Sequence, residues 1–141
     1  MTETISHIAL RRISGVKDKV PFQALEGITL SKDERDCLVI HSELLPENPL
    51  ITNDIVELEN ETSFRWMGRA DNLINSGGVK IIPETIEKLI KPFMNTKFFF
   101  AGVPDEKLGE KLVLVVEGQP MNEGDEAELL TDIKTDLHKY E

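Results

Sequence analysis

The stretch FRWMGRADNLINSGGVKIIPETIEKL, residues 64–89, marks a change in the texture of the chain near Gly68. Before Gly68, short apolar runs recur between turn-like clusters, a pattern typical of β-strands. Apolar residues alternate with charged ones in the runs 50–58 and 64–66, which flank the polar link ENETS. We therefore expect these two runs to form a β-hairpin.

After Gly68 the pattern mixes helix and strand signals. Proline suits the first position of a helix, and after Pro83 apolar residues follow at helical spacing, with Pro92 marking the end: Ile86, Leu89, Ile90 and Phe93. The apolar runs 97–103 and 112–117 indicate two strands joined by the polar loop PDEKLGEK. A second helix is predicted over 125–137 from the spacing of Leu130, Ile133 and Leu137.

These elements predict an α/β (α+β) fold, in which a β-rich part precedes a small α/β part with a short sheet and two helices. The final HKYE stops without a cap, a glycine or a proline, so we expect the small part to be truncated. Charged residues of the polar loop, Lys107, Glu110 and Lys111, are expected to be solvated.

The composition narrows the class of protein. The 141 residues carry 26 acidic and 16 basic side chains, a formal net charge of −10, which disfavours nonspecific binding to nucleic acids. The one cysteine, Cys37, excludes an internal disulfide and a multi-cysteine zinc site, and we expect it to fill the core. The histidines His7, His41 and His138 are too scattered for a metal site. With neither a secretory leader nor a membrane span in the sequence, we expect a cytoplasmic protein.

The stretch 64–89 carries an ordered set of motif residues. It reads Gly-Arg-x-Asp, then a turn with serine and glycine, then Pro-x-x-Ile-Glu: Gly68, Arg69, Asp71, Ser76, Gly77, Gly78, Pro83, Ile86 and Glu87. This order resembles the hinge and following loop of the adenylate-forming superfamily, which includes acyl-CoA synthetases, luciferases and peptide-synthetase adenylation domains. The resemblance implies that 1–67 is the end of the large nucleotide-binding domain, 68–71 the hinge, and 72–141 an incomplete small C-terminal domain.

The resemblance also implies roles for these residues. Arg69 would contact the nucleotide, since an arginine ending a strand presents a flat fork of donors to ribose hydroxyls or phosphate oxygens. Asp71 would be the hinge about which the small domain swings, and the loop of Ser76, Gly77 and Gly78 would line the channel for the pantetheine of CoA. Without the resemblance, a solvated strand-end arginine, a turn aspartate and a plain Ser-Gly-Gly turn explain the same residues.

Two further matches lie upstream. The segment LITNDIVEL resembles the Thr-Gly-Asp motif of the superfamily, in which the aspartate, here Asp54, accepts hydrogen bonds from both ribose hydroxyls. Asn53 replaces the common glycine, and asparagine tolerates left-handed backbone conformations. Thr2 and Glu3 match the end of Tyr-Gly-x-Thr-Glu, which implies α-phosphate binding by Thr2 and Mg²⁺ binding by Glu3. The Tyr-Gly pair is missing, so we expect Met1 to be an internal methionine of a longer protein, or a start codon assigned at one; a frayed N-terminus is the alternative.

The resemblance implies an ATP-dependent, AMP-forming acid–thiol ligase that uses ATP, Mg²⁺, CoA and a small carboxylic acid. The segments NLINSGGVKIIPE and AGVPDEKLGEKLVL are most similar to those of bacterial o-succinylbenzoate–CoA ligases of menaquinone biosynthesis. Another acyl-CoA synthetase or adenylation domain, or a noncatalytic interaction module derived from one, remains an alternative. Because no phosphate loop and no C-terminal Gly-Lys turn occur, we expect this fragment alone to be inactive. We also expect unpaired strand edges in 1–67 to favour self-association.

Overall fold

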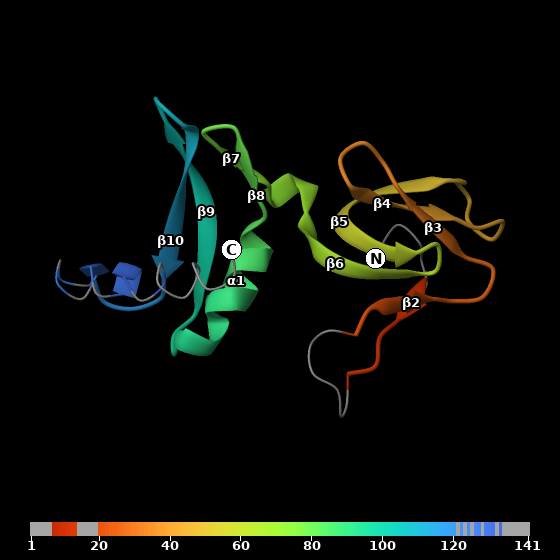
Figure 1. Ribbon diagram of the computed structural model, residues 1–141, viewed down its shortest axis with the longest axis horizontal. Coiled ribbons are helices and arrows are strands. Elements are labelled where there is room, and N and C mark those ends of the chain that lie inside the picture. Colours follow the sequence, from red (N-terminus) through yellow and green to blue (C-terminus); the bar gives the residue numbers. More distant parts are fainter. Residues whose placement is uncertain are drawn as a thin grey trace. The chain divides into compact units, whose positions relative to one another are not determined.

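The computed structural model describes residues 7–13 and 20–120, and beyond them residues 122, 124, 126, 127, 129–131 and 133. The chain divides into two compact units, and the division falls between Asp71 and Asn72 (Figure 1). Each unit is described by itself. No helix in the described part of the chain has the length and apolar character that a membrane crossing requires.

The first unit is built on a six-stranded antiparallel sheet in the order β1-β2-β6-β5-β4-β3. Its strands are β1 (Ala9–Leu10), β2 (Phe22–Ala24), β3 (Thr29–Lys32), β4 (Cys37–His41), β5 (Leu50–Asn60) and β6 (Ser63–Arg69). The predicted hairpin is confirmed as β5 and β6, the two central strands. At its tip, the carbonyls of Glu61 and Thr62 accept hydrogen bonds from Leu30 N (2.8 Å) and Ala24 N (2.7 Å). The hairpin tip therefore ties strands from both sides of the sheet.

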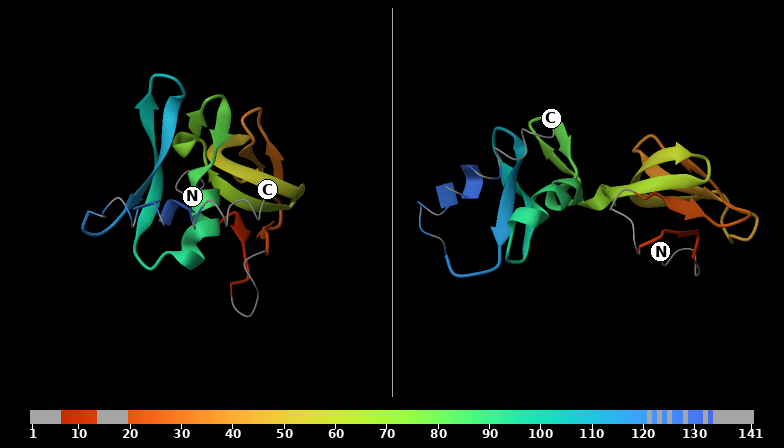
Figure 2. Two further views of the ribbon diagram at one scale, coloured as in Figure 1. Left: turned by 60° about the vertical axis from the view of Figure 1, so that its left-hand side comes forward. Right: turned by 60° about the horizontal axis from the view of Figure 1, so that its bottom comes forward.

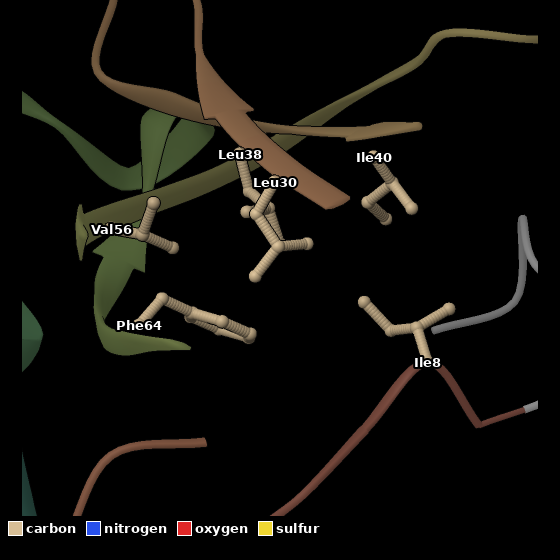
Figure 3. Packing of buried hydrophobic residues seen from close by; sticks show 6 residues of the cluster. All are labelled: Ile8, Leu30, Leu38, Ile40, Val56 and Phe64. Atoms are coloured by element: carbon tan, nitrogen blue, oxygen red, sulfur yellow. The ribbon is translucent and has the colours of Figure 1, made fainter. Parts of the chain in front are cut away.

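The core of this unit lies on one side of the curved sheet. Figure 3 shows apolar side chains from β3, β4, β5, β6 and the segment before β1 pointing toward one another: Ile8, Leu30, Leu38, Ile40, Val56 and Phe64. Cys37 is fully buried, as predicted, and removal from water is the main reason that the pKa of its thiol is raised. The thiol is therefore a packing group.

The second unit is a four-stranded antiparallel sheet in the order β8-β7-β10-β9 with helix α1 beside it. Its elements are β7 (Ile74–Ser76), β8 (Val79–Ile81), α1 (Pro83–Ile90), η2 (Lys91–Phe93), β9 (Phe98–Asp105) and β10 (Gly109–Val116). The short turn η1 (Ala70–Asn72) spans the division between the units. Helix α1 begins at Pro83, as predicted. It lies against β9 (Figures 1 and 2), and Phe100 N on β9 donates to Glu87 Oε1 at 2.9 Å.

The predicted α/β fold class is confirmed, with one difference in detail. Strands β9 and β10 extend into the predicted polar loop, which shrinks to 106–108 because Asp105 Oδ1 accepts from Lys107 N and Leu108 N, both at 2.9 Å, and closes a tight turn. The described residues between 124 and 133 are helical, in agreement with the second predicted helix, and Ile133 is buried. Asp125 and Leu137 of that prediction lie outside the described residues.

Candidate functional site

The pair Asp54 and Arg69 stands at the centre of the candidate site. The two residues are register partners on β5 and β6, and Arg69 is the last residue of β6. The pairing depends on a bulge: Ile55 pairs with Gly68 but Val56 pairs with Trp66, which leaves Met67 as the extra residue. Without this bulge Gly68 would stand opposite Asp54. The bulge therefore brings the arginine to the carboxylate.

The Asp54 carboxylate is held by neighbours on both strands. Its Oδ1 accepts a hydrogen bond from Trp66 Nε1 at 3.1 Å and lies 3.9 Å from Arg69 Nη1. The Asp54 side chain is only 16% exposed. Its backbone N–H donates to Thr52 Oγ1 (3.2 Å), and that hydroxyl donates to the carbonyl of Leu38 (2.8 Å). These contacts fix the carboxylate, and a carboxylate with two acceptor oxygens keeps capacity for further donors.

Asp71 is tied to the same strands. Arg69 Nη2 donates to Asp71 Oδ2 at 2.7 Å, and Asn53 Nδ2 donates to Asp71 Oδ1 at 3.2 Å. Asn53 Oδ1 in turn accepts from Arg35 Nη1 at 3.1 Å. Arg35 also pairs with Asp33 at 2.8 Å. Acidic and basic groups thus alternate along one connected network.

Asp33 and Arg35 stabilise each other's charged form. The pKa of Arg35 is raised, first by its hydrogen bond to Asp33 and also by the charge of Asp71. Partial desolvation alone would raise the pKa of Asp33, but hydrogen bonds from Cys37 N–H and from Arg35 outweigh it, so the pKa is lowered. Asp33 and Arg35 therefore stay charged at neutral pH.

Sequence reasoning missed Arg35 and Trp66 as members of the site. Arg35 lies 18 residues before its partner Asn53, in the turn before β4, and no motif points to it. Trp66 is read from the sequence only as an apolar strand residue, although its indole N–H donates to Asp54. The alternation along 64–66 predicts on which face of the sheet each side chain lies. It does not predict that the indole N–H of Trp66 makes a hydrogen bond.

The turn in the Ser-Gly-Gly segment is shorter than the sequence predicts. Ser76 ends β7 and pairs with Gly109, so only Gly77 and Gly78 form the turn. Their φ angles are +60° and +88°, which favour glycine. The Gly77 amide is not open, because it donates to the carbonyl of Leu108 at 2.8 Å. The turn is thereby joined to the β9–β10 turn.

Other predicted residues have simpler places. Thr2, Glu3 and His138 lie outside the described residues. The described part of the chain contains no group of three or more metal-ligating side chains, and His41 shares a hydrogen bond of 2.8 Å with Ser31. Glu110 corrects the expectation of a solvated loop charge, since it lies in β10 and its Oε2 accepts from Asn75 N at 2.8 Å.

This geometry suits binding more than bond making. A fixed carboxylate can accept hydrogen bonds from a pair of hydroxyls, while the neighbouring guanidinium donates to an oxygen of the same ligand. Among the described residues of the network there is no cysteine thiolate, serine or histidine placed as a nucleophile or base. The chemistry of the pair therefore suits a ligand that carries two neighbouring hydroxyls.

Comparison with known proteins shows which enzymes this chain is similar to. No family model matches the chain. The chain is 28% identical over 128 residues to the medium/long-chain-fatty-acid–CoA/3-oxocholest-4-en-26-oate–CoA ligase of Mycolicibacterium smegmatis, which covers 90% of this chain and 23% of the relative. The chain therefore spans about a quarter of the length of this curated relative. The homologues are acyl-CoA ligases.

Solved structures of the same class share the fold. The anthranilate CoA ligase AuaEII in complex with anthranoyl-AMP matches with a TM-score of 0.73 at 16% identity, over 96% of this chain and 32% of that chain. The unliganded o-succinylbenzoate coenzyme A synthetase of Bacillus subtilis matches with a TM-score of 0.68 at 20% identity, over 96% and 34%. The predicted resemblance to acyl-CoA ligases is confirmed by the curated relative, and the fold is shared with these two structures.

Proposed function

We propose that this chain is the hinge-bearing part of an ATP-dependent, AMP-forming acyl-CoA ligase. In such a ligase a carboxylate oxygen attacks the α-phosphate of ATP, which releases pyrophosphate and leaves an acyl-adenylate. The thiol of CoA then attacks the acyl carbon, and AMP leaves as the thioester forms. In this proposal 1–67 belongs to the nucleotide-binding domain, 68–71 is the hinge, and 72–141 belongs to the small C-terminal domain.

The observation that carries the proposal is the Asp54–Arg69 pair across β5 and β6. Trp66 and Thr52 hold Asp54 in place before any ligand arrives, which lowers the entropy lost on binding. We propose that Asp54 accepts hydrogen bonds from both ribose hydroxyls, while Arg69 contacts the nucleotide beside them. Both residues would thus orient the adenosine toward the reacting phosphate.

The remaining roles concern the other substrates. Asp71 would be the hinge residue, and the loop of Ser76, Gly77 and Gly78 would border the CoA channel. Thr2 would bind the α-phosphate and Glu3 would hold Mg²⁺, which neutralises phosphate charge when bound. The carboxylates of the described network do not fit that metal, because arginine or tryptophan donors already engage Asp33, Asp54 and Asp71.

The carboxylic acid substrate is proposed from the similarity of sequence segments. The motifs after Asn72 favour o-succinylbenzoate, the substrate of the menaquinone pathway ligases that they resemble. The name of the Mycolicibacterium relative favours a medium- or long-chain fatty acid or a steroid acid instead. Thioester formation from o-succinylbenzoate, with dodecanoate as the competitor, by a ligase that contains this sequence would separate the two.

We further propose that these 141 residues alone bind a nucleotide without adenylating an acid. Adenylation requires preorganised positive charge around the triphosphate, whereas Arg35 and Arg69 are each paired with carboxylates and the net charge is −10. ATP–pyrophosphate exchange should stay at background, and exchange above it would contradict this part of the proposal. Self-association through exposed residues such as Ile13 (83% exposed) would show in light scattering as mass that rises with concentration.

Trp66 offers a direct test of nucleotide binding. It is the chain's one tryptophan, and its indole N–H bonds the carboxylate proposed to bind ribose. Addition of AMP should change Trp66 fluorescence in a saturable way, whereas adenine, which has no ribose, should have little effect. The Asp54→Ala variant controls for light absorption by the nucleotide. Equal responses to AMP in wild type and this variant would overturn the proposal.

A further inference from the structure

Two consecutive side chains at the division between the units are held by different units. Asp71, the last residue of the first unit, accepts hydrogen bonds from Arg69 and Asn53 of that unit. Asn72, the first residue of the second unit, donates through Nδ2 to Glu84 Oε1 at 2.6 Å, and Glu84 lies in the first turn of α1. Each unit therefore holds one of the two residues that the Asp71–Asn72 peptide bond joins.

Arg35 determines how Asn53 is oriented. Because Arg35 donates to Asn53 Oδ1, the amide Nδ2 is directed at the Asp71 carboxylate. The opposite amide orientation would set an NH₂ group against a guanidinium and an oxygen against a carboxylate. Asp33 fixes Arg35 in turn, through a hydrogen bond of 2.9 Å from Arg35 Nε and the 2.8 Å ion pair. The network thus runs from the turn before β4 to the edge of the unit.

We propose that Asn53 and Asn72 are positioning residues that confine rotation between the units to the backbone at Asp71 and Asn72. This inference rests on the hinge role that the proposed function gives to Asp71. A glycine, the residue that the resembled motif more often has at position 53, has no side chain to hold Asp71. Asn53 thus adds to this chain an attachment that the motif does not require.

These contacts are weak, which suits a hinge that must rotate. The side chains of Asp71 and Arg69 are 55% and 44% exposed, and exposed polar contacts stabilise weakly. A hinge needs only a few backbone dihedrals to change, so weak contacts on either side keep the rest of each unit ordered without locking the swing. Short 3-10 turns such as η1, which contains both residues, are frequent connectors.

The variant Asn53→Asp gives the sharpest test. It keeps the size of the side chain and can still accept from Arg35, but it cannot donate to Asp71 and adds a like charge beside it. We expect ¹⁵N relaxation of the nucleotide-free chain to show lower order parameters at residues 70–73 in Asn53→Asp, Asn53→Gly and Asn72→Ala. The population of the released state should rise roughly 2- to 10-fold, the range for loss of one hydrogen bond.

Controls separate this effect from damage to the fold. Arg65→Ala removes the ion pair with Glu59 on the same hairpin and should leave residues 70–73 unchanged. Because Arg35 acts through Asn53, adding Arg35→Ala to Asn53→Gly should loosen these residues no further. Unchanged order parameters in all three variants, with chemical shifts elsewhere native, would overturn the inference. The measurement needs no nucleotide, so failure of AMP to bind would refute the proposed function and leave this result intact.

Discussion

Asp54 stands opposite Arg69 because the strand β6 contains one residue more than its partner at Met67. This bulge shifts the register at the end of the hairpin and sets a carboxylate beside a guanidinium. Bulges recur next to binding sites for this reason, since they re-aim one side chain without rebuilding the sheet.

Arg69→Ala should weaken AMP binding. A hydrogen bond to a charged group contributes about 1.5 to 3 kcal/mol, so we expect a roughly 10- to 100-fold rise in Kd by calorimetry. The Kd of Arg69→Lys should lie between those of wild type and Arg69→Ala, because an ammonium group keeps the charge but lacks the planar fork. Arg65→Ala, four residues earlier on the same strand, is the matched control. An Arg69→Ala protein that binds AMP as tightly as wild type would remove Arg69 from the site.

Trp66 should report on Asp54 even without a ligand. In Asp54→Ala the indole N–H loses its acceptor, so the emission of Trp66 should shift relative to wild type. Asp54→Asn keeps an acceptor oxygen and should shift it less, although it removes the charge. Identical emission from all three proteins would contradict the contact between Trp66 and Asp54.

Gly78→Ala should destabilise the second unit through the backbone alone. A Cβ at Gly78 would have no heavy atom within 4 Å, but φ is +88°, so we expect a loss of about 1 to 2 kcal/mol in the free energy of unfolding. Gly78→Asn should lose less, because asparagine tolerates left-handed conformations. Urea unfolding followed by circular dichroism measures both. Equal loss in the two variants would mean that something other than φ limits this position.

Asp105 should make the stability of the second unit depend on acid. Hydrogen bonds from Leu108 N–H and Lys107 N–H lower its pKa below the ordinary 3.8, so the folded state favours the charged form. Its contribution is complete above pH 3.8 and is lost as the pH falls through the lower folded pKa. The difference in unfolding free energy between wild type and Asp105→Asn should therefore shrink as acid is added below 3.8. A constant difference would refute this.

The larger features of the fold could be predicted from patterns in single segments. The hairpin of β5 and β6 follows from alternation on either side of a polar link, and α1 follows from Pro83 and the apolar spacing after it. The extents of β9 and β10 were missed, because polar residues such as Glu110 can belong to a strand when a partner accepts or donates to them. Periodicity does not contain that information.

The site was predictable only where motif residues carried it. Asp54 and Arg69 are named by their positions in the sequence, but their contact depends on the bulge at Met67, which has no sequence signature here. Arg35 enters the network through a long-range contact with Asn53, and such contacts follow from the folded sheet and not from local spacing. Local chemistry nominates residues, and tertiary structure decides which of them meet.

The most direct test of the account is a double comparison of AMP and 2′,3′-dideoxy-AMP on wild type and Asp54→Ala. If Asp54 accepts from both ribose hydroxyls, wild type should bind AMP roughly 10-fold or more tightly than the dideoxy compound, since each hydrogen bond to a charged group is strong. That preference should vanish in Asp54→Ala. Equal binding of the two nucleotides by wild type, or an undiminished preference in the variant, would contradict the assignment of this site.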